Sequence, residues 1–141
     1  MGDPLDRRPA GVDDATVAAL GKLSEALEYV IRVRGHVYDV HQLVGRADLL
    51  IGEAVEQLRE AGHRELADQL DREVVGRNVL AGRWTFQIVE EFDDGYYAAV
   101  VDAERRAREE LVGGARHVYE AEMKRARRTP GAPGHEAAPG E

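Results

Sequence analysis

Residues 13–62 carry the sequence DDATVAALGKLSEALEYVIRVRGHVYDVHQLVGRADLLIGEAVEQLREAG, and this stretch decides the fold. Its apolar residues recur at spacings of three, four or seven, which is the spacing of one face of an α-helix. We call this row the inner stripe, and its members are Leu20, Leu23, Leu27, Val30, Val37, Val44, Ile51, Val55 and Leu58. The pattern predicts a long helix whose inner stripe faces a core.

Both ends of this predicted helix carry recognisable signals. Asp13 or Asp14 is suited to cap its first turn, because a carboxylate there accepts hydrogen bonds from free backbone N–H groups. Gly62 is suited to the left-handed position that follows a helix. An uninterrupted helix between these ends would be about 70 Å long, which is too long for a compact monomer of this size. We therefore expect a break near Gly35 or Gly45, and the sequence does not decide between the two.

The placement of proline indicates an all-α protein. The five prolines lie at positions 4, 9, 130, 133 and 139, so residues 10–129 contain none. A proline-free body with helical periodicity favours helices throughout, since proline inside a helix costs about 3 kcal/mol. We predict an antiparallel three- or four-helix bundle over residues 13–128, with flexible tails at 1–12 and 129–141.

Two further helical segments are expected after the first. The second begins near His63 and runs to a turn at Asp93-Asp94-Gly95; its residues 84–89 have a strand-like composition but are assigned to the helix because no partner strand is evident. The third is expected to run from about Tyr96 to Arg127, and a kink is expected at Gly113-Gly114.

Composition excludes several classes of protein. The 141 residues are 43% hydrophobic and 33% charged, which is typical of a globular domain. With 19 basic and 27 acidic residues, the net charge of −8 makes nucleic acid an improbable partner. The absence of cysteine excludes disulfides and thiol chemistry. No apolar run is long enough to span a membrane, so a cytoplasmic location is expected.

Three polar residues interrupt the inner stripe at seven-residue intervals: Arg34, His41 and Asp48. Seven residues are nearly two helical turns, so all three are predicted to face inward with the stripe. They are about 10 Å apart along the helix axis and cannot contact one another. Their partners must come from other segments, and the candidates are Glu90 or Glu91 for Arg34, and Arg77 or Arg83 for Asp48.

Two interpretations of this polar row stay open. In the first, the row belongs to an interhelical network that fixes the register of the bundle. In the second, the row lines a ligand-binding or catalytic pocket, with the only tryptophan supplying an aromatic wall. The residues predicted for such a pocket are Arg34, His41, Asp48, Asn78, Trp84 and Glu90.

The ligand motifs do not predict a di-metal centre, and no cofactor is expected. Di-metal helical bundles use Glu-x-x-His pairs on two helices, and Glu60-Ala61-Gly62-His63 is the single match, at a helix end. The carboxylates of residues 90–94 are interpreted as an exposed acidic helix end, which basic side chains such as Arg77 or Arg83 would offset. The basic residues 124–128 suit the negative end of a helix dipole.

Residues 34–48, which begin RGHVYDVHQL, and residues 76–87, GRNVLAGRWTFQ, resemble a family of small helical proteins of actinobacteria. The high ratio of arginine to lysine, 17 to 2, agrees with a GC-rich genome. The resemblance covers roughly residues 20–100. The family has no assigned activity, so the resemblance implies no functional residue.

Two hypotheses for function follow. In the first, the chain is a non-enzymatic cytoplasmic protein that forms a homo-oligomer or binds a protein partner, because no phosphate-binding loop or nucleophile motif is present. In the second, the chain is a helical bundle that binds a small molecule or a metal at the polar row. This second hypothesis includes an enzyme whose active site lies at the same residues. A pocket between the first helix and the Trp84 segment would favour the second hypothesis.

Overall fold

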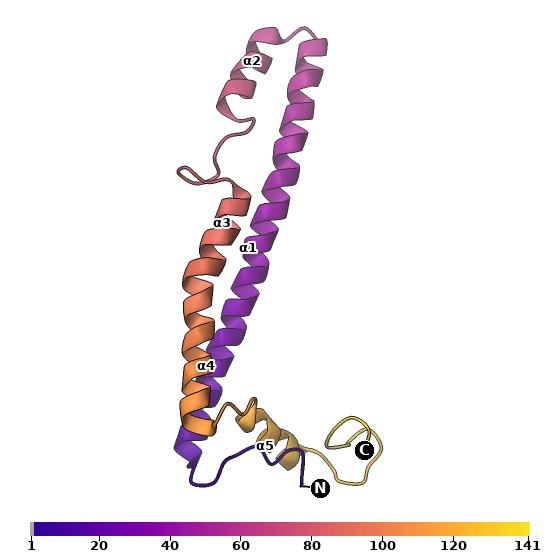
Figure 1. Cartoon of the computed structure of the whole chain (residues 1–141). Helices are drawn as coiled ribbons and strands as arrows, with labels where there is room; N and C mark the ends of the chain where they lie inside the picture. The colour runs from indigo at the N-terminus through magenta and orange to yellow at the C-terminus, as the bar shows by residue number, and fades with distance from the viewer. Residues whose placement is uncertain (1) are drawn as a thin grey trace. The chain divides into compact units, whose positions relative to one another are not determined.

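The computed structural model describes residues 2–141, and the predicted all-α class is confirmed (Figure 1). Its helices, in chain order, are α1 (Asp14–Glu60), α2 (Arg64–Glu73), α3 (Thr85–Phe92), the π-helix η1 (Asp93–Tyr97), α4 (Ala98–Val112) and α5 (Val118–Arg127). Over this described range no strand is formed, and the only β-type pairing is an isolated bridge between Leu80 and Arg83.

The chain divides into two compact units. Unit 1 comprises residues 1–30 and 99–141, and unit 2 comprises residues 31–98. The helical body expected as one domain over residues 13–128 is thus divided between them. Helix α1 contributes residues to both units, and each unit is described by itself below.

Helix α1 is continuous from Asp14 to Glu60, so the expected break near Gly35 or Gly45 is wrong. A glycine in a helix interior costs only about 1 kcal/mol, and the inner stripe packs on both sides of these positions, which outweighs that cost. Both predicted end signals are confirmed. The Asp13 carboxylate accepts a hydrogen bond from the Thr16 N–H at 2.8 Å.

The C-terminal end of α1 has the hydrogen bonds of a Schellman motif. The N–H of His63 donates to the carbonyl of Leu58 at 2.9 Å, and the N–H of Gly62 donates to that of Arg59 at 3.0 Å. Gly62 has a φ of 92°, a left-handed conformation that glycine adopts without strain. This geometry ends the helix and reverses the chain into α2.

Unit 2 is an antiparallel helical hairpin. As the residue number increases along α1, the residue number of the contacted partner in the returning chain decreases. The contacts are Arg34 with Asp93, His41 with Thr85, Asp48 with Gly76, and Arg59 with Asp68. Figure 1 shows α2 and α3 running back beside α1. The buried apolar residues of this unit are Val55, Ala67 and Val89.

The second predicted segment is not one helix. The chain leaves helical conformation between α2 and α3, over residues 74–84, where Gly76 and Gly82 have φ values of 73° and 71°. Two glycines in left-handed conformation, six residues apart, interrupt the backbone hydrogen bonds of a helix. The apolar residues of this segment therefore keep a helical spacing in the sequence, although the chain here is not helical. The assignment of residues 84–89 to a helix rather than a strand is confirmed from Thr85 onward by α3, whereas Trp84 is the extended residue that precedes this helix.

The expected turn at Asp93-Asp94-Gly95 is also wrong. These residues form the first part of η1, which follows α3 directly in the chain, so helical conformation continues through the expected turn. The break occurs further on, where Gly113 and Gly114 have φ values of 64° and 84° and end α4. A pair of left-handed glycines separates α4 from α5, where the sequence indicated only a kink.

Unit 1 has two small cores. Val17 and Leu20 of α1 pack with Val112 and Val118. The second core brings both terminal segments to α5, because Leu5 and Ala137 are buried with Ala121. These contacts place the terminal segments against α5, while their expected flexibility stays a prediction.

An ion pair also holds the N-terminal segment on α5. The Arg8 guanidinium donates two hydrogen bonds to the Glu122 carboxylate, at 2.7 and 2.9 Å. These bonds hold the pKa of Glu122 below its usual value.

Among residues 2–141, no helix combines the length and the apolar composition needed to cross a membrane.

Candidate functional site

The polar row of α1 faces the returning chain of unit 2. Arg34, His41 and Asp48 are each half-buried, whereas most positions beside them on α1 are exposed. Each contacts a different part of residues 76–93. The prediction that the three share the inward face of the helix is confirmed, and the heptad spacing is its cause.

Arg34 forms a bidentate ion pair with Asp93. Its Nε donates to Oδ1 at 2.8 Å and its Nη2 donates to Oδ2 at 3.1 Å. The rings of Tyr38 and Tyr97 lie 5.1 and 5.2 Å from the guanidinium carbon, within the range of cation–π attraction. The hydrogen bonds from Arg34 hold the pKa of the Asp93 carboxyl below its usual value. This cluster fixes η1 on α1.

His41 contacts the start of α3. Its Nδ1 lies 2.7 Å from the Oγ1 of Thr85, the first residue of that helix. Gln87 caps the N-terminus of the same helix, because its side-chain oxygen accepts a hydrogen bond from the Trp84 backbone N–H at 2.7 Å. The imidazole therefore contacts a helix end that is already ordered by its own side chains.

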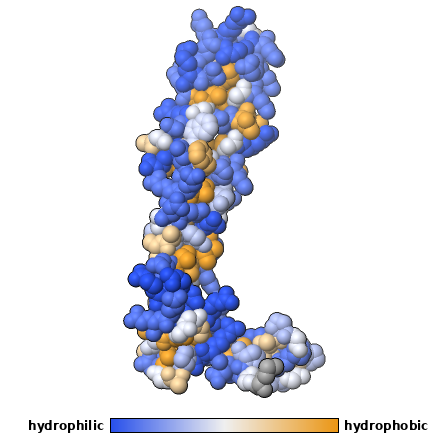
Figure 2. Space-filling view, viewed as in Figure 1, coloured by the Kyte–Doolittle hydropathy of each residue, from blue (hydrophilic) through white to orange (hydrophobic). Residues whose placement is uncertain are grey.

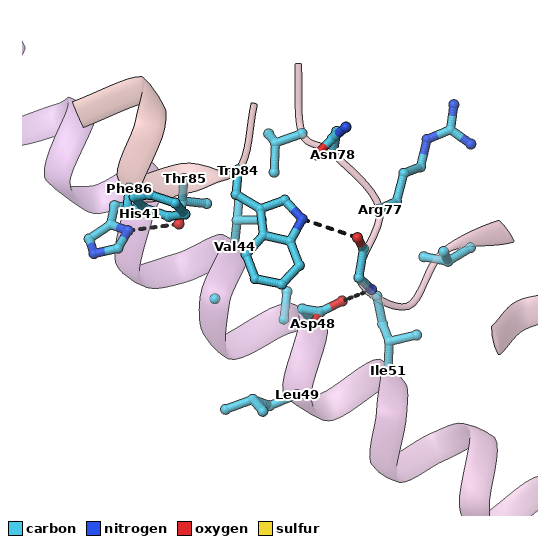
Figure 3. A pocket seen from close by; sticks show the side chains of 15 residues that line it. His41, Val44, Asp48, Leu49, Ile51, Arg77, Asn78, Trp84, Thr85 and Phe86 are labelled. Atoms are coloured by element: carbon cyan, nitrogen blue, oxygen red, sulfur yellow. Dashed lines mark hydrogen bonds between the residues drawn. The ribbon is translucent and has the colours of Figure 1, made fainter. Parts of the chain in front are cut away.

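Asp48 positions the loop between α2 and α3. Its Oδ1 accepts a hydrogen bond from the Gly76 N–H at 2.8 Å, and the Gly76 carbonyl accepts one from the Trp84 indole N–H at 3.0 Å (Figure 3). Asp48 thus holds the loop backbone, and the loop backbone orients the indole. A left-handed glycine at 76 exposes both of its backbone groups to these partners.

A surface cavity of about 570 Å³ lies around Trp84. Its apolar wall includes Val44, Leu49, Ile51, Val74, Val79, Trp84 and Phe86. Its polar members include His41, Asp48, Arg77, Asn78 and Thr85. Figure 3 shows the indole lying above α1 between Val44 and Asp48. A concave apolar wall with a few polar groups is the usual composition of a small-molecule site.

Four of the six predicted site residues line this cavity: His41, Asp48, Asn78 and Trp84. The cavity walls do not include Arg34, which belongs to the ion-pair cluster on η1, or Glu90, which is exposed on α3. The structure therefore brings most of the predicted residues together. Ligand binding by them stays a prediction.

The partners expected for the polar row are wrong. Arg34 pairs with Asp93 and not with Glu90 or Glu91, because α3 runs on into η1 and brings the next turn of the chain to Arg34. Asp48 binds a backbone N–H and not a guanidinium, because the left-handed glycine places an amide against α1.

The four carboxylates of residues 90–94 have separate surroundings. Glu91 forms an ion pair with Arg83 that includes a hydrogen bond of 3.2 Å, and this pairing lowers the pKa of Glu91. Asp93 pairs with Arg34. The expectation that basic side chains offset this acidic segment is confirmed for Arg83, and the carboxylates do not converge on one cation.

Sequence reasoning missed four residues that complete the site: Gly76, Thr85, Asp93 and Tyr97. One of them left a signal in the sequence. Gly76 lies between two segments of helical periodicity, where a glycine commonly interrupts a helix. Asp93 and Tyr97 reach Arg34 only through the π-helix, which no local pattern predicted.

Unit 1 contains one group of metal-binding side chains within the described residues. Ligand atoms of Glu28, His117 and Glu120 lie within 4.8 Å of one another. Glu28 and His117 are exposed and Glu120 is half-buried. Within the group, the Nδ1 of His117 approaches a carboxylate oxygen of Glu120 to 3.8 Å. An exposed trio of this kind is common on acidic surfaces without an ion.

Comparison of the chain with protein-family models, with curated proteins and with solved structures found no match. The resemblance of residues 34–48 and 76–87 to small actinobacterial proteins therefore stays a prediction. The function has to be argued from the geometry of the two units.

Proposed function

We propose that the protein is a non-enzymatic helical assembly module that self-associates through the exposed apolar surface of unit 2. The observation that carries this proposal is the imbalance between buried and exposed apolar side chains in residues 31–98. Buried there are only Val55, Ala67 and Val89. Exposed there are Ile31, Val33, Tyr38, Val40, Leu43, Leu49, Leu50, Leu66, Val79, Leu80, Trp84, Phe86 and Tyr96.

The exposed apolar side chains of unit 2 are more numerous than the scattered single ones that a monomer surface usually carries. Leu43 and Leu49 retain 68% and 62% of their accessible area, and hydrophobic patches interrupt the hydrophilic surface in Figure 2. Exposed apolar side chains gathered in patches on a helical protein are typical of an interface. Burial of such area contributes roughly 25 cal/mol per Å², and unit 2 has little other apolar burial to stabilise it.

Sedimentation velocity tests this proposal over a range from low to high micromolar protein. We expect a species heavier than the 15.6 kDa chain, with a population that grows with concentration. The melting temperature should rise with concentration as well, because association stabilises only the folded chain. A strict monomer at high micromolar concentration, with a melting temperature independent of concentration, contradicts the proposal.

A second candidate function is the binding of a small apolar molecule in the Trp84 cavity. The cavity wall favours it, since an aromatic and aliphatic surface there meets the side chains of His41 and Asn78. Arg77 also lines the cavity and suits an acidic substituent on such a molecule. The two candidate functions share part of their surface, since Leu49, Trp84 and Phe86 belong both to the exposed apolar set of unit 2 and to the cavity wall.

Fluorescence of the single tryptophan tests the second candidate directly. Titration with anilinonaphthalene sulfonate, an apolar anionic dye, should quench Trp84 by energy transfer. Gly45 lines the cavity, and a Cβ built there meets no atom within 4 Å, so the larger side chain of Gly45→Leu should extend into the cavity and weaken dye binding. Gly35→Leu, on the same helix outside the cavity, is the matched control. Equal dye binding by both variants contradicts a site in this cavity.

A cytoplasmic location remains part of this proposal. The absence of cysteine supports it, because a chain that works in a reducing compartment needs no disulfide.

A further inference from the structure

We infer that the partner of α1 is a second copy of this chain, bound antiparallel along a second apolar row of the helix. This inference rests on the proposed function and names its partner and register. The row, here called the outer seam, repeats at alternating spacings of three and four residues. Its members are the apolar residues Val33, Val40, Leu43, Ala47, Leu50 and Ala54, with the polar His36 at one position of the repeat.

The outer seam is exposed in the single chain. Val33, Val40, Leu43 and Leu50 retain between 41% and 68% of their accessible area. Ala47 and Ala54 are exposed as well. A strict three–four repeat is the pattern of a coiled-coil contact, because it keeps one face of a helix on its partner. The inner stripe already provides such a face for α3, so the outer seam is a second one.

The angle between the two faces suits a four-helix bundle. Each outer-seam position precedes by one residue a position of the inner stripe or of the polar row, which share one face of α1, and one residue turns an α-helix by about 100°. A helix at the corner of a four-helix bundle contacts two neighbours at nearly a right angle. Helix α1 would therefore contact its own α3 through one face and the second copy through the other.

Charge complementarity identifies the second copy as the occupant. A row of charged residues flanks the outer seam on the side away from the inner stripe, again at seven-residue intervals: Arg32, Asp39, Arg46 and Glu53. In an antiparallel pair with Val40 opposite Leu43 and Val33 opposite Leu50, the charged row of one copy faces the charged row of the other. Asp39 then lies opposite Arg46 of the second copy, and Arg32 lies opposite Glu53. Twofold symmetry forms each pair twice.

The same charges disfavour antiparallel pairs that are shifted by one heptad in either direction. A shift of one heptad in one direction places Arg32 opposite Arg46 and Asp39 opposite its own copy. The opposite shift places Asp39 opposite Glu53 and Arg46 opposite its own copy. Both shifts create only like-charge contacts along the row, and a parallel pair would place the row opposite the valines and isoleucine of the inner stripe. Flanking charges of this kind commonly set orientation and register in coiled coils.

Charge reversal in the full-length chain tests the register. Arg46→Glu alone places a carboxylate opposite Asp39, and Asp39→Arg alone places a guanidinium opposite Arg46. Each variant creates two repulsive contacts per dimer, and we expect the dissociation constant to rise about tenfold or more. The double variant Asp39→Arg with Arg46→Glu restores opposite charges and should return the constant to near the native value. Positions 39 and 46 are seven residues apart, so the exchange creates no pair within one helix.

Arg64→Glu is the control for charge reversal as such, because Arg64 is exposed on α2 outside the outer seam. Circular dichroism verifies that every variant stays helical. If the native chain associates but Asp39→Arg and Arg46→Glu bind as well as the control, or the double variant is not restored, the register is wrong while self-association stands. If the native chain is a strict monomer, the proposed function fails instead.

Spin labels provide a second test that does not perturb the charges. The chain contains no cysteine, so one introduced cysteine gives one label per copy. Gln42 and Glu56 are both exposed on α1, on the same face of the helix. In the antiparallel pair, labels at Gln42→Cys lie close to the twofold axis, whereas labels at Glu56→Cys are about 45 Å apart along the helices. Short distances at both positions would indicate a parallel pair and overturn the inference.

Discussion

At the scale of the residue, the Arg34–Asp93 pair gives a testable dependence of stability on pH. The pKa of Asp93 is lowered in the folded chain because Arg34 donates two hydrogen bonds to its carboxylate. The contribution of this pair to stability is therefore complete above the ordinary aspartate pKa of 3.8, and is lost as the pH falls through the lower folded value. Asp93→Asn should lower the melting temperature at neutral pH and have little effect near pH 2.

Asp94→Asn is the matched control for this experiment, since Asp94 is the exposed neighbour in the same π-helix. Thermal unfolding of the three proteins across this pH range measures the effect. A gap between Asp93→Asn and the native chain that stays constant with pH would contradict the assignment of the ion pair.

At the scale of the element, two glycines of α1 should respond in opposite ways to the same substitution. A Cβ at Gly35 meets no atom within 4 Å, so Gly35→Ala should stabilise the helix by about 1 kcal/mol. A Cβ at Gly21 would lie 3.0 Å from the Cβ and Cγ of Tyr119, so Gly21→Ala should displace the ring and destabilise unit 1. Denaturant unfolding of the two variants measures both signs. Equal stabilisation by both would show that Tyr119 does not pack closely on α1.

The same element shows how far the sequence predicts this structure. The inward face of α1 follows from its repeat, because seven residues are close to two turns, and this fixed the direction of Arg34, His41 and Asp48. The partners of these residues depend on where the returning chain loses and gains helical turns. Two left-handed glycines at 76 and 82 and a π-helix at 93–97 decide that, and the apolar period contains neither.

At the scale of the whole molecule, the C-terminal segment should protect the N-terminal one from exchange. Ala137 is buried with Leu5 and Ala121, and its carbonyl accepts a hydrogen bond from Lys124 Nζ at 2.7 Å. Deletion of residues 129–141 should therefore speed amide hydrogen exchange around Leu5 and along α5. Amides of residues 31–98 provide the internal control, since they belong to the other unit. Unchanged exchange at Leu5 would indicate that both terminal segments are flexible, as their composition suggests.

The uninterrupted α1 has a consequence for how the chain tolerates changes in length. Insertion of a single residue before Gly35 rotates everything after it by about 100°, which would turn the outer seam toward α3 and bring its flanking charges onto the seam. Insertions or deletions of a full heptad keep every row in place, provided that the returning segment changes by a matching amount. Related chains should therefore differ in α1 by multiples of seven residues, and gaps of other sizes should fall in the loop between α2 and α3.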